Sequence, residues 1–184
     1  LSNQKQGHME KTAICHLPFI PLRSGAGHRY EQVSQLLFGE MFRVIKKKEG
    51  SWAYVKMLAD GYEGWAHLPE CRVVEPGFAK GFQKVKPFFV ADYMMMVGSH
   101  ERMVHVGFGS PLPYCEGKIF KIGEESFSFF GEPVQADRSM SMEELLNLGL
   151  KLLDTAYLWG GRGVFGIDCS AFVQQLFKFK DISI

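Results

Sequence analysis

Apolar and polar positions alternate in short stretches over the first third of the chain. Residues 41–45 and 52–58 show this alternation, and turn-forming residues such as those at 24–28 and 60–61 separate the stretches. A period of two over a few residues is typical of strands with one buried face. Several such strands, closely spaced and joined by turns, predict a small β-barrel over residues 12–76.

The pattern continues over residues 77–138 with less regular turns. Phe127 and Phe129 alternate with Ser126 and Ser128, which predicts a half-buried strand. Further strands are expected at 87–91, 103–108 and 117–122. We therefore expect a second, diverged barrel here. The run of methionines at 94–96 is interpreted as gap-filling core.

The period changes to that of a helix after residue 138. Ser141 and Glu144 have the spacing of a capping box, which predicts a helix through the leucines at 145–153. Asp168 is a good N-cap, so a second helix is predicted to begin at Cys169. Its apolar face is expected to hold Phe172, Val173, Leu176 and Phe177.

Cys169 would lie in the first turn of that helix, directly after a run of glycines. The positive end of a helix favours a thiolate, which is the reactive form of cysteine. The amides of the same turn can hold an oxyanion on an attacked carbonyl. The sequence thus allows an activated nucleophile. The other interpretation, a buried and inert small apolar residue, is the commoner fate of a free cysteine.

Composition and charge exclude several classes of protein. The chain has 184 residues, enough for one large domain or two small ones, and a net charge of +1. So small a charge gives no field to attract nucleic acid or a membrane surface. The absence of an apolar run of 18 residues predicts no membrane span.

The cysteines do not indicate a disulfide-stapled protein. Cys15, Cys71, Cys115 and Cys169 are evenly spread, without a C-x-x-C pair. A zinc site from Cys15 and Cys71 with neighbouring histidines is a minor alternative, because the short paired spacings of such sites are missing. No metal or organic cofactor is expected.

One long motif connects the glycine loop to the cysteine. It has the form Tyr-x-Trp-Gly-Gly at 157–161, followed by Gly-x-Asp-Cys-Ser-x-Phe-Val at 166–173. This motif resembles the nucleophile motif of the NlpC/P60 cysteine peptidases, with Ala171 where the family usually has Gly. The resemblance implies a papain-like α+β domain with a Cys nucleophile, a His base and a third polar residue.

A second resemblance concerns the first predicted barrel. The Leu-Phe-Gly-Glu turn at 37–40, the Gly-Ser-Trp strand start at 50–55 and Gly-Tyr-x-Gly-Trp-Ala at 61–66 occur in an order similar to bacterial SH3 domains. The implied fold class is mainly β plus α. Its parts are a polar tail (1–11), SH3-like barrels (12–76 and 77–138), and the N-terminal helical part of a papain-like NlpC/P60 domain (139–184).

All six histidines precede Cys169, whereas the family's base lies downstream of its cysteine. We therefore expect a C-terminally truncated piece that lacks part of its own catalytic domain. Alone, it should have negligible peptidase activity. The apolar faces of 145–153 and 172–177 would then be exposed, pack on a partner chain or pack differently than in an intact enzyme.

The order of parts resembles the γ-D-glutamyl-L-diamino acid endopeptidases, which trim murein peptides with a free N-terminal L-Ala. By this resemblance Cys169 attacks the γ-D-Glu carbonyl. Asp168 and Ser170 flank it, and Asp168 holds the substrate ammonium. Tyr157 donates its hydroxyl to the oxyanion or the substrate, and Tyr62 and Glu31 close the pocket from the first barrel. Simpler roles remain open, namely a helix cap, a core aromatic and an ordinary barrel residue.

The implied compartment is bacterial and cytoplasmic rather than periplasmic or secreted, because the given chain has no signal peptide. A rival from another class is a non-catalytic module that binds wall polymers or peptides through SH3-like grooves. A phosphate-binding loop at 160–163 is disfavoured, since it lacks G-x-G-x-x-G spacing and a Lys-Ser/Thr pair.

Overall fold

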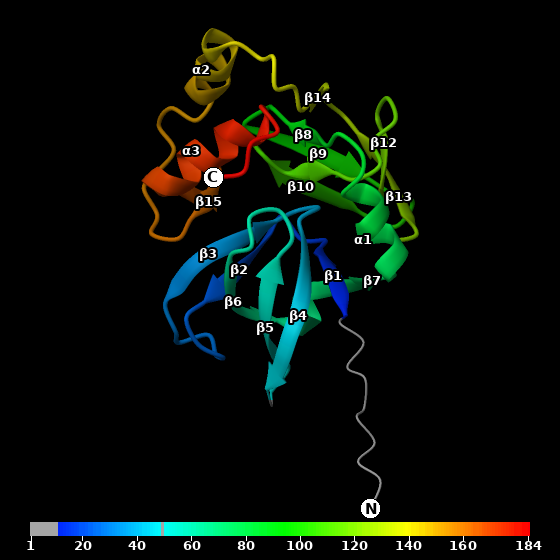
Figure 1. The fold of residues 1–184 in the computed structure, drawn as a ribbon, viewed down its shortest axis with the longest axis vertical. Helices are drawn as coiled ribbons and strands as arrows, with labels where there is room; N and C mark the ends of the chain where they lie inside the picture. The colour runs from blue at the N-terminus through cyan, green and yellow to red at the C-terminus, as the bar shows by residue number, and fades with distance from the viewer. Residues whose placement is uncertain (1–10, 49) are drawn as a thin grey trace, which may run out of the picture.

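The computed structural model describes residues 11–48 and 50–184, and it is mainly β with few helices. The expectation of a polar tail falls almost entirely outside the described residues. Figure 1 shows the large sheet in the lower half, with the smaller sheets and the helices α2 and α3 above it.

The first part is a seven-stranded antiparallel sheet in the order β3-β2-β6-β5-β4-β1-β7. Its core includes Ile20, Leu36 and Phe42. The end strands β3 and β7 do not pair with each other, so closure into a barrel is not confirmed. The elements are β1 (Thr12–Cys15), β2 (Phe19–Arg23), β3 (Gln32–Leu37), β4 (Met41–Lys48), β5 (Trp52–Met57), β6 (Glu63–His67), the 3-10 turn η1 (Leu68–Glu70) and β7 (Cys71–Val74).

The second part follows a short helix, α1 (Pro76–Phe82), which the sequence pattern did not predict. Its strands form two separate sheets, β10-β9-β13-β12 and β11-β8-β14, so a second barrel is not confirmed either. The strands are β8 (Phe88–Val90), β9 (Met94–Gly98), β10 (Met103–Gly107), β11 (Pro111–Leu112), β12 (Ile119–Ile122), β13 (Glu125–Phe129) and β14 (Pro133–Gln135).

Two expectations for the second part have different outcomes. Phe127 and Phe129 are buried at 1% and 2% exposure, which confirms the half-buried strand. The core interpretation of the methionine run is wrong for Met94 and Met96, both 39% exposed. Only Met95 packs on the core, because alternate residues of a strand face opposite sides of its sheet.

The helices begin where the sequence predicts. Ser141 and Glu144 form the capping box of α2 (Met142–Leu150), and Asp168 is the N-cap of α3 (Cys169–Lys178). α2 ends sooner than expected, and Asp154 has a left-handed φ of 64°. A two-stranded hairpin, β15 (Arg162–Gly163) and β16 (Gly166–Ile167), leads into α3.

The predicted apolar face of α3 is largely confirmed, because Leu176 is buried and Phe172 and Phe177 are partly buried against the core. The buried residues are Ala171, Gln175 and Leu176, whereas Val173 is 40% exposed. The prediction is therefore wrong for Val173 alone, and it did not include Ala171 and Gln175.

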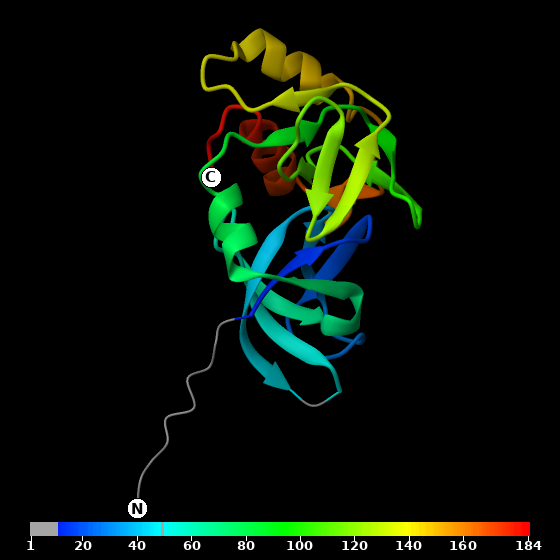
Figure 2. The same cartoon turned by 90° about the vertical axis from the view of Figure 1, so that its right-hand side faces the viewer.

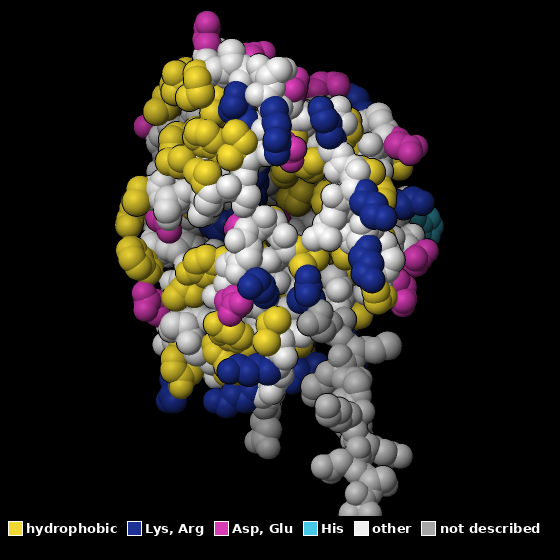
Figure 3. Space-filling view, viewed as in Figure 1, with side chains coloured by type: hydrophobic (Ala, Val, Ile, Leu, Met, Phe, Trp, Pro, Cys, Tyr) yellow, Lys and Arg dark blue, Asp and Glu magenta, His cyan; other side chains and the backbone are white. Residues whose placement is uncertain are grey.

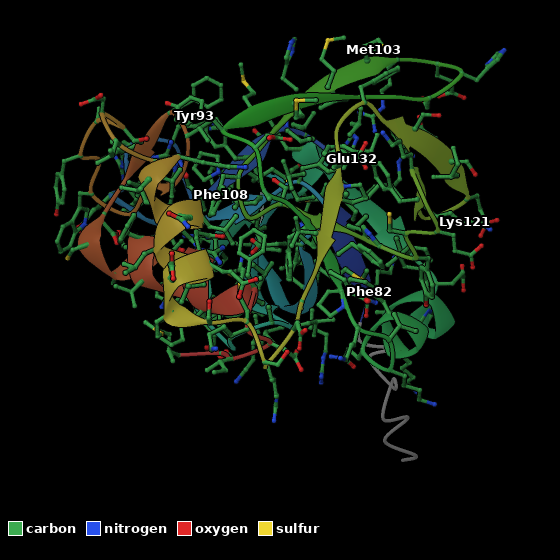
Figure 4. All side chains as sticks on the ribbon, turned by 90° about the horizontal axis from the view of Figure 1, so that it is seen from above. Phe82, Tyr93, Met103, Phe108, Lys121 and Glu132 are labelled. Carbon is green, nitrogen blue, oxygen red and sulfur yellow. The ribbon has the colours of Figure 1, made fainter. Side chains whose placement is uncertain are left out.

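The three parts share two continuous cores. Ile14 and Phe38 of the first sheet pack in one cluster with Phe120 and Phe127 of the second part. A second cluster joins Phe108 to α2 and α3. The view in Figure 2 shows the second part seated on the first sheet, and Figure 4 shows Phe108 beside α2 with Met103 at the outer edge. The predicted domain boundaries remain a prediction.

One face of α2 is uncovered, as the sequence analysis considered. Leu146 and Leu150 are 63% and 58% exposed, and Leu153 just beyond the helix is 65% exposed. Apolar side chains are prominent in the upper left of Figure 3, where Figure 1 places α2 and α3. Within the described part of the chain, no helix is long and apolar enough to cross a membrane.

Candidate functional site

A tight elbow carries the chain into α3. The amide of Gly161 donates to the carbonyl of Leu158 at 2.9 Å, and the amide of Asp168 donates back to the carbonyl of Gly161 at 3.0 Å. Gly160 has φ +68°, and a Cβ there would lie 2.8 Å from the carbonyl oxygen of Gln32. Glycine is therefore required for the elbow to lie directly against β3.

Asp168 fastens this elbow to the helix. One carboxylate oxygen accepts from the amide of Ala171 and the hydroxyl of Ser170, both at 2.7 Å. The other accepts from the amide of Gly160 at 3.1 Å. The helix-cap role is thus confirmed for Asp168. The capping carboxylate therefore lies at the first turn of α3, and Cys169 is the next residue in the chain.

Cys169 is the exposed cysteine of the four, and all four are free thiols. Cys15 is buried, and burial raises its pKa well above the usual value. Burial likewise raises the pKa of Cys71, to about 12, and that of Cys115. A buried neutral thiol is a poor nucleophile. Cys169 is therefore more accessible to reagents than the partly buried Cys71 and Cys115 and the buried Cys15.

Two of the predicted site residues, Glu31 and Tyr62, lie beside this elbow and come from the first part of the chain. The indole Nε1 of Trp159 donates to Glu31 Oε1 at 2.7 Å, and Gln32 Nε2 donates to the carbonyl of Trp159 at 3.3 Å. The Tyr62 hydroxyl donates to the carbonyl of Val33 at 3.0 Å. These contacts place Tyr62 and Glu31 on the β3 side of the elbow, close to Asp168.

The electrostatics confirm this proximity. Partial burial raises the pKa of Tyr62, and the carboxylates of Asp168, Asp60 and Glu31 raise it further, against a lowering effect of the Arg162 guanidinium. Asp60 also pairs with Arg162 Nη2 at 3.6 Å, so Asp168 and Glu31 are the carboxylates that make the surface beside this phenol locally negative. Such a surface favours a cation, and an ammonium group can also donate hydrogen bonds to the carboxylates.

Tyr157 lies at the start of the elbow and is 67% exposed. Its backbone forms a bridge with Ile167, immediately before Asp168. It is therefore not a core aromatic. Asp168, Ser170, Tyr62 and Glu31 lie together around the elbow, and the chemical roles assigned to them and to Tyr157 stay predictions.

A buried ionic cluster lies on the other side of the elbow. Arg162 Nη1 contacts Glu40 Oε2 at 2.7 Å, and Arg162 Nη2 contacts Glu40 Oε1 at 3.1 Å. Lys178 Nζ, near the end of α3, contacts Glu40 Oε1 at 2.6 Å. Arg162 and Glu40 are each 3% exposed. The guanidinium also donates to the carbonyl of Gln35 at 2.5 Å.

The charges of this cluster are strongly coupled. Burial alone would raise the pKa of Glu40, but the charges of Arg162 and Lys178 outweigh burial and hold that pKa at about 2. For Lys178 burial is the larger effect, and it lowers the pKa despite the attraction of Glu40. Glu40 is therefore ionised throughout the physiological range.

Sequence reasoning missed Trp159 as the partner of Glu31 and missed the role of Arg162. Arg162 was considered only as part of a phosphate-binding loop, yet its guanidinium is occupied by Glu40. One signal was available, because an arginine between two glycines in an otherwise apolar stretch has few local partners. Its partner, 122 positions away, carried no matching signal.

Histidines and metal ligands do not complete a catalytic set within the described residues. His28 and His67 pack against Trp52 at the β4–β5 hairpin. Cys15 and Cys71 lie opposite each other on β1 and β7. Even so, residues 11–48 and 50–184 contain no group of three His, Cys, Asp or Glu side chains able to hold a metal ion.

A cavity of about 300 Å³ lies at the C-terminal end of α3. Its walls are mostly apolar, with Met41, Phe82 and Phe89 among them, and Glu40 and Lys178 also line it. It corresponds to the hollow near the middle of the face in Figure 3. Cys169 is at the opposite end of the same helix and does not line this cavity.

Comparison with protein families and curated proteins gives two matches. Residues 22–68 match the bacterial dipeptidyl-peptidase SH3 domain. The chain is 26% identical over 177 residues to a γ-D-glutamyl-L-lysine dipeptidyl-peptidase of Bacillus subtilis, covering 82% of this chain and 54% of that protein. The chain thus spans about half the length of this curated relative.

Comparison with solved structures concerns the fold. An NlpC/P60 family protein from Bacillus cereus superposes with a TM-score of 0.75 at 19% identity, covering 94% of this chain and 73% of that one. An NlpC/P60 endopeptidase from Photobacterium damselae subsp. piscicida gives a TM-score of 0.73 at 17% identity, covering 95% and 43%. The chain therefore shares the fold of NlpC/P60 family proteins and contains a bacterial SH3 segment in its first sheet.

Proposed function

We propose that the chain carries the nucleophile and part of the substrate site of a cysteine peptidase. The bond it cleaves joins γ-D-Glu to an L-diamino acid in murein peptides with a free N-terminal L-Ala. The observation that carries this proposal is the meeting of Glu31 and Tyr62, from the first sheet, with the Asp168–Cys169 turn. The name of the Bacillus subtilis relative agrees with such a substrate.

A peptidase that removes two residues from an N-terminus has to recognise the terminal ammonium. The negative surface that Asp168 and Glu31 make beside Tyr62 suits that group. Asp168 is adjacent to Cys169, so a bound ammonium would lie a short distance from the thiol.

In the proposed reaction the Cys169 thiolate attacks the γ-carbonyl carbon and a tetrahedral oxyanion forms. The amides of Cys169 and Ser170 in the first turn of α3, with the Tyr157 hydroxyl, are the proposed donors to it. Collapse breaks the C–N bond, the departing amine takes a proton, and water hydrolyses the thioester. The imidazole that removes the thiol proton has to come from outside the described residues.

The first experiment measures substrate recognition without requiring turnover. Cys169 is alkylated with iodoacetamide in the presence of L-Ala-γ-D-Glu-L-Lys, and the modified cysteines are located by mass spectrometry. We expect the free peptide to slow alkylation of Cys169, while its N-acetylated form does not. Equal protection by both peptides, or none by either, would contradict the proposed ammonium site.

The second experiment addresses catalysis. The purified 184-residue chain should give negligible hydrolysis of the same peptide, because no imidazole is held beside Cys169 in the described residues. Full hydrolysis by this chain would show that interpretation to be wrong. The alternative of a non-catalytic binding module is favoured if all four cysteines are alkylated slowly at one rate.

A further inference from the structure

One carboxylate, that of Glu40, connects the first sheet to both flanks of the cysteine. It lies at the turn between β3 and β4, 3% exposed, and its Oε2 also accepts from the amide of Leu37 at 2.9 Å. This local bond fixes the carboxylate relative to β3. Neither oxygen is left for a further ligand, because each has two partners.

The two cations that Glu40 holds lie on opposite sides of Cys169 in the sequence. Arg162 precedes the cysteine by seven positions and begins the β15–β16 hairpin, which continues directly into Asp168. Lys178 follows it by nine positions and is the last residue of α3. The carboxylate therefore fixes the hairpin before the nucleophile and the end of the helix that bears it.

Further contacts tie the same points to the first two parts of the fold. The amide of Arg162 donates to Gln35 Oε1 at 2.8 Å, so β15 is bound to β3 through backbone as well as side chain. Lys178 Nζ lies 3.4 Å from the carbonyl of Gly109 in the second part. Figure 1 shows β15 and α3 directly above β3, where this cluster is buried.

We propose that Glu40 is a positioning residue through which the first sheet sets the place of Cys169. It acts as a two-point clamp on the hairpin and the helix, and it touches no substrate. This inference rests on the proposed function only in taking Cys169 as the reactive group. A purely structural role would need Glu40 merely to neutralise buried positive charge, and the two roles can be separated.

The test uses the whole 184-residue chain in four forms. Glu40→Gln removes the charge and keeps the shape. The double variant Glu40→Gln/Lys178→Gln restores the original net charge of the cluster but not the clamp. Lys178→Gln keeps the Glu40–Arg162 pair and releases the helix end alone. Glu63→Gln, which removes a partly exposed carboxylate 3.2 Å from Lys56, is the matched control.

Two measurements are made on each variant, namely the alkylation rate of Cys169 and amide hydrogen exchange. If Glu40 sets the position of Cys169, the alkylation rate of Cys169 should change about fivefold or more in Glu40→Gln and in the double variant. Exchange should accelerate at Gly161, Ile167 and Asp168, whose amides close the elbow, while strands β4 and β5 keep their protection. Glu63→Gln should leave both measurements as in the unaltered chain.

Charge neutralisation alone makes the opposite prediction. If the double variant recovers the Cys169 rate and elbow protection of the unaltered chain, Glu40 is no clamp and the proposal is overturned. If Glu40→Gln does not fold, Lys178→Gln decides. Faster exchange at the end of α3, with a protected elbow, supports the clamp, and unchanged exchange there contradicts it. Neither the alkylation rate nor hydrogen exchange requires hydrolysis. A failure of the proposed function would appear in the peptide-protection experiment instead, independently of these results.

Discussion

The two carboxylate sites on either side of the elbow differ in how their charge is used. Glu40 is buried and has a partner for each oxygen, two of them cations. Glu31 lies at the surface and Asp168 is half-buried, both near Tyr62, and neither has a cation among its side-chain hydrogen-bond partners. A buried carboxylate neutralised by cations can only hold structure, whereas a more accessible carboxylate with uncharged partners can still bind a cation. Stability should therefore depend on the first site and recognition on the second.

The largest effect on stability is expected from Glu40→Leu. It leaves Arg162 with only the more distant Asp60 carboxylate, 3.6 Å away, and removes the carboxylate that pairs with Lys178; breaking a buried pair in this way costs about 3–5 kcal/mol. Urea unfolding monitored by circular dichroism measures the loss. The control Glu63→Leu removes a partly exposed partner of Lys56 and should cost under about 1 kcal/mol. Equal losses would show that burial does not distinguish these carboxylates.

The next largest effect should be the decrease in the free energy of unfolding as the pH falls. The pKa of Glu40 is about 2 in the folded chain against an ordinary 4.5, so the unfolded chain binds a proton first as pH falls. Its contribution is complete above about pH 5 and is lost toward pH 2, with a size of about 3 kcal/mol. Urea unfolding at a series of pH values measures this slope.

Glu40→Gln provides the comparison for that measurement. Glu125 also has a lowered pKa: its hydrogen bonds to Ser99 and Arg72 outweigh the effect of burial, so part of the decrease at low pH is not due to Glu40. The difference between the two chains isolates Glu40. The variant should be less stable near neutral pH and should lose less stability on acidification. Parallel pH profiles would contradict the assigned pKa.

A smaller effect is expected from Gly160→Ala, which acts on the contact between the two sites. The added Cβ would lie within 3 Å of the β3 backbone at a residue with φ +68°. The strain and displacement should cost about 1–3 kcal/mol. Trp159 should separate from Glu31, which a change in tryptophan fluorescence would report. Gly117→Ala, also at a left-handed φ but in open space, is the control that isolates the close approach.

These sites also show what sequence patterns could predict. The start of α3, its Asp168 cap and the capping box at Ser141 were predictable, because each depends on residues within four positions of one another. The resemblance supplied Cys169, Tyr62 and Glu31 as candidates. Their approach to the elbow then required the fold, since β3 and the elbow are more than 120 positions apart.

The missed features have a common physical cause. The burial of Glu40 with Arg162 depends on how the first sheet packs on the hairpin, and no local period encodes that packing. The one misplaced residue of the predicted α3 face, Val173, has the same origin. Gln175 is fully buried although it is polar, and Val173 is exposed although it is apolar. A helix pattern identifies an apolar stripe, but the neighbouring elements decide which side is covered.

The smallest expected effect on stability, and the sharpest separation of the two sites, comes from Asp168→Asn. Asparagine caps a helix about as well as aspartate, so unfolding free energy should change by under about 0.5 kcal/mol, whereas Asp168→Ala should lose about 1 kcal/mol with the cap. Protection of Cys169 by L-Ala-γ-D-Glu-L-Lys should nevertheless disappear in both variants, because the ammonium loses the charge nearest the thiol. If Asp168→Asn keeps full protection, the carboxylate serves only as a helix cap, and the negative surface at Tyr62 does not select the substrate.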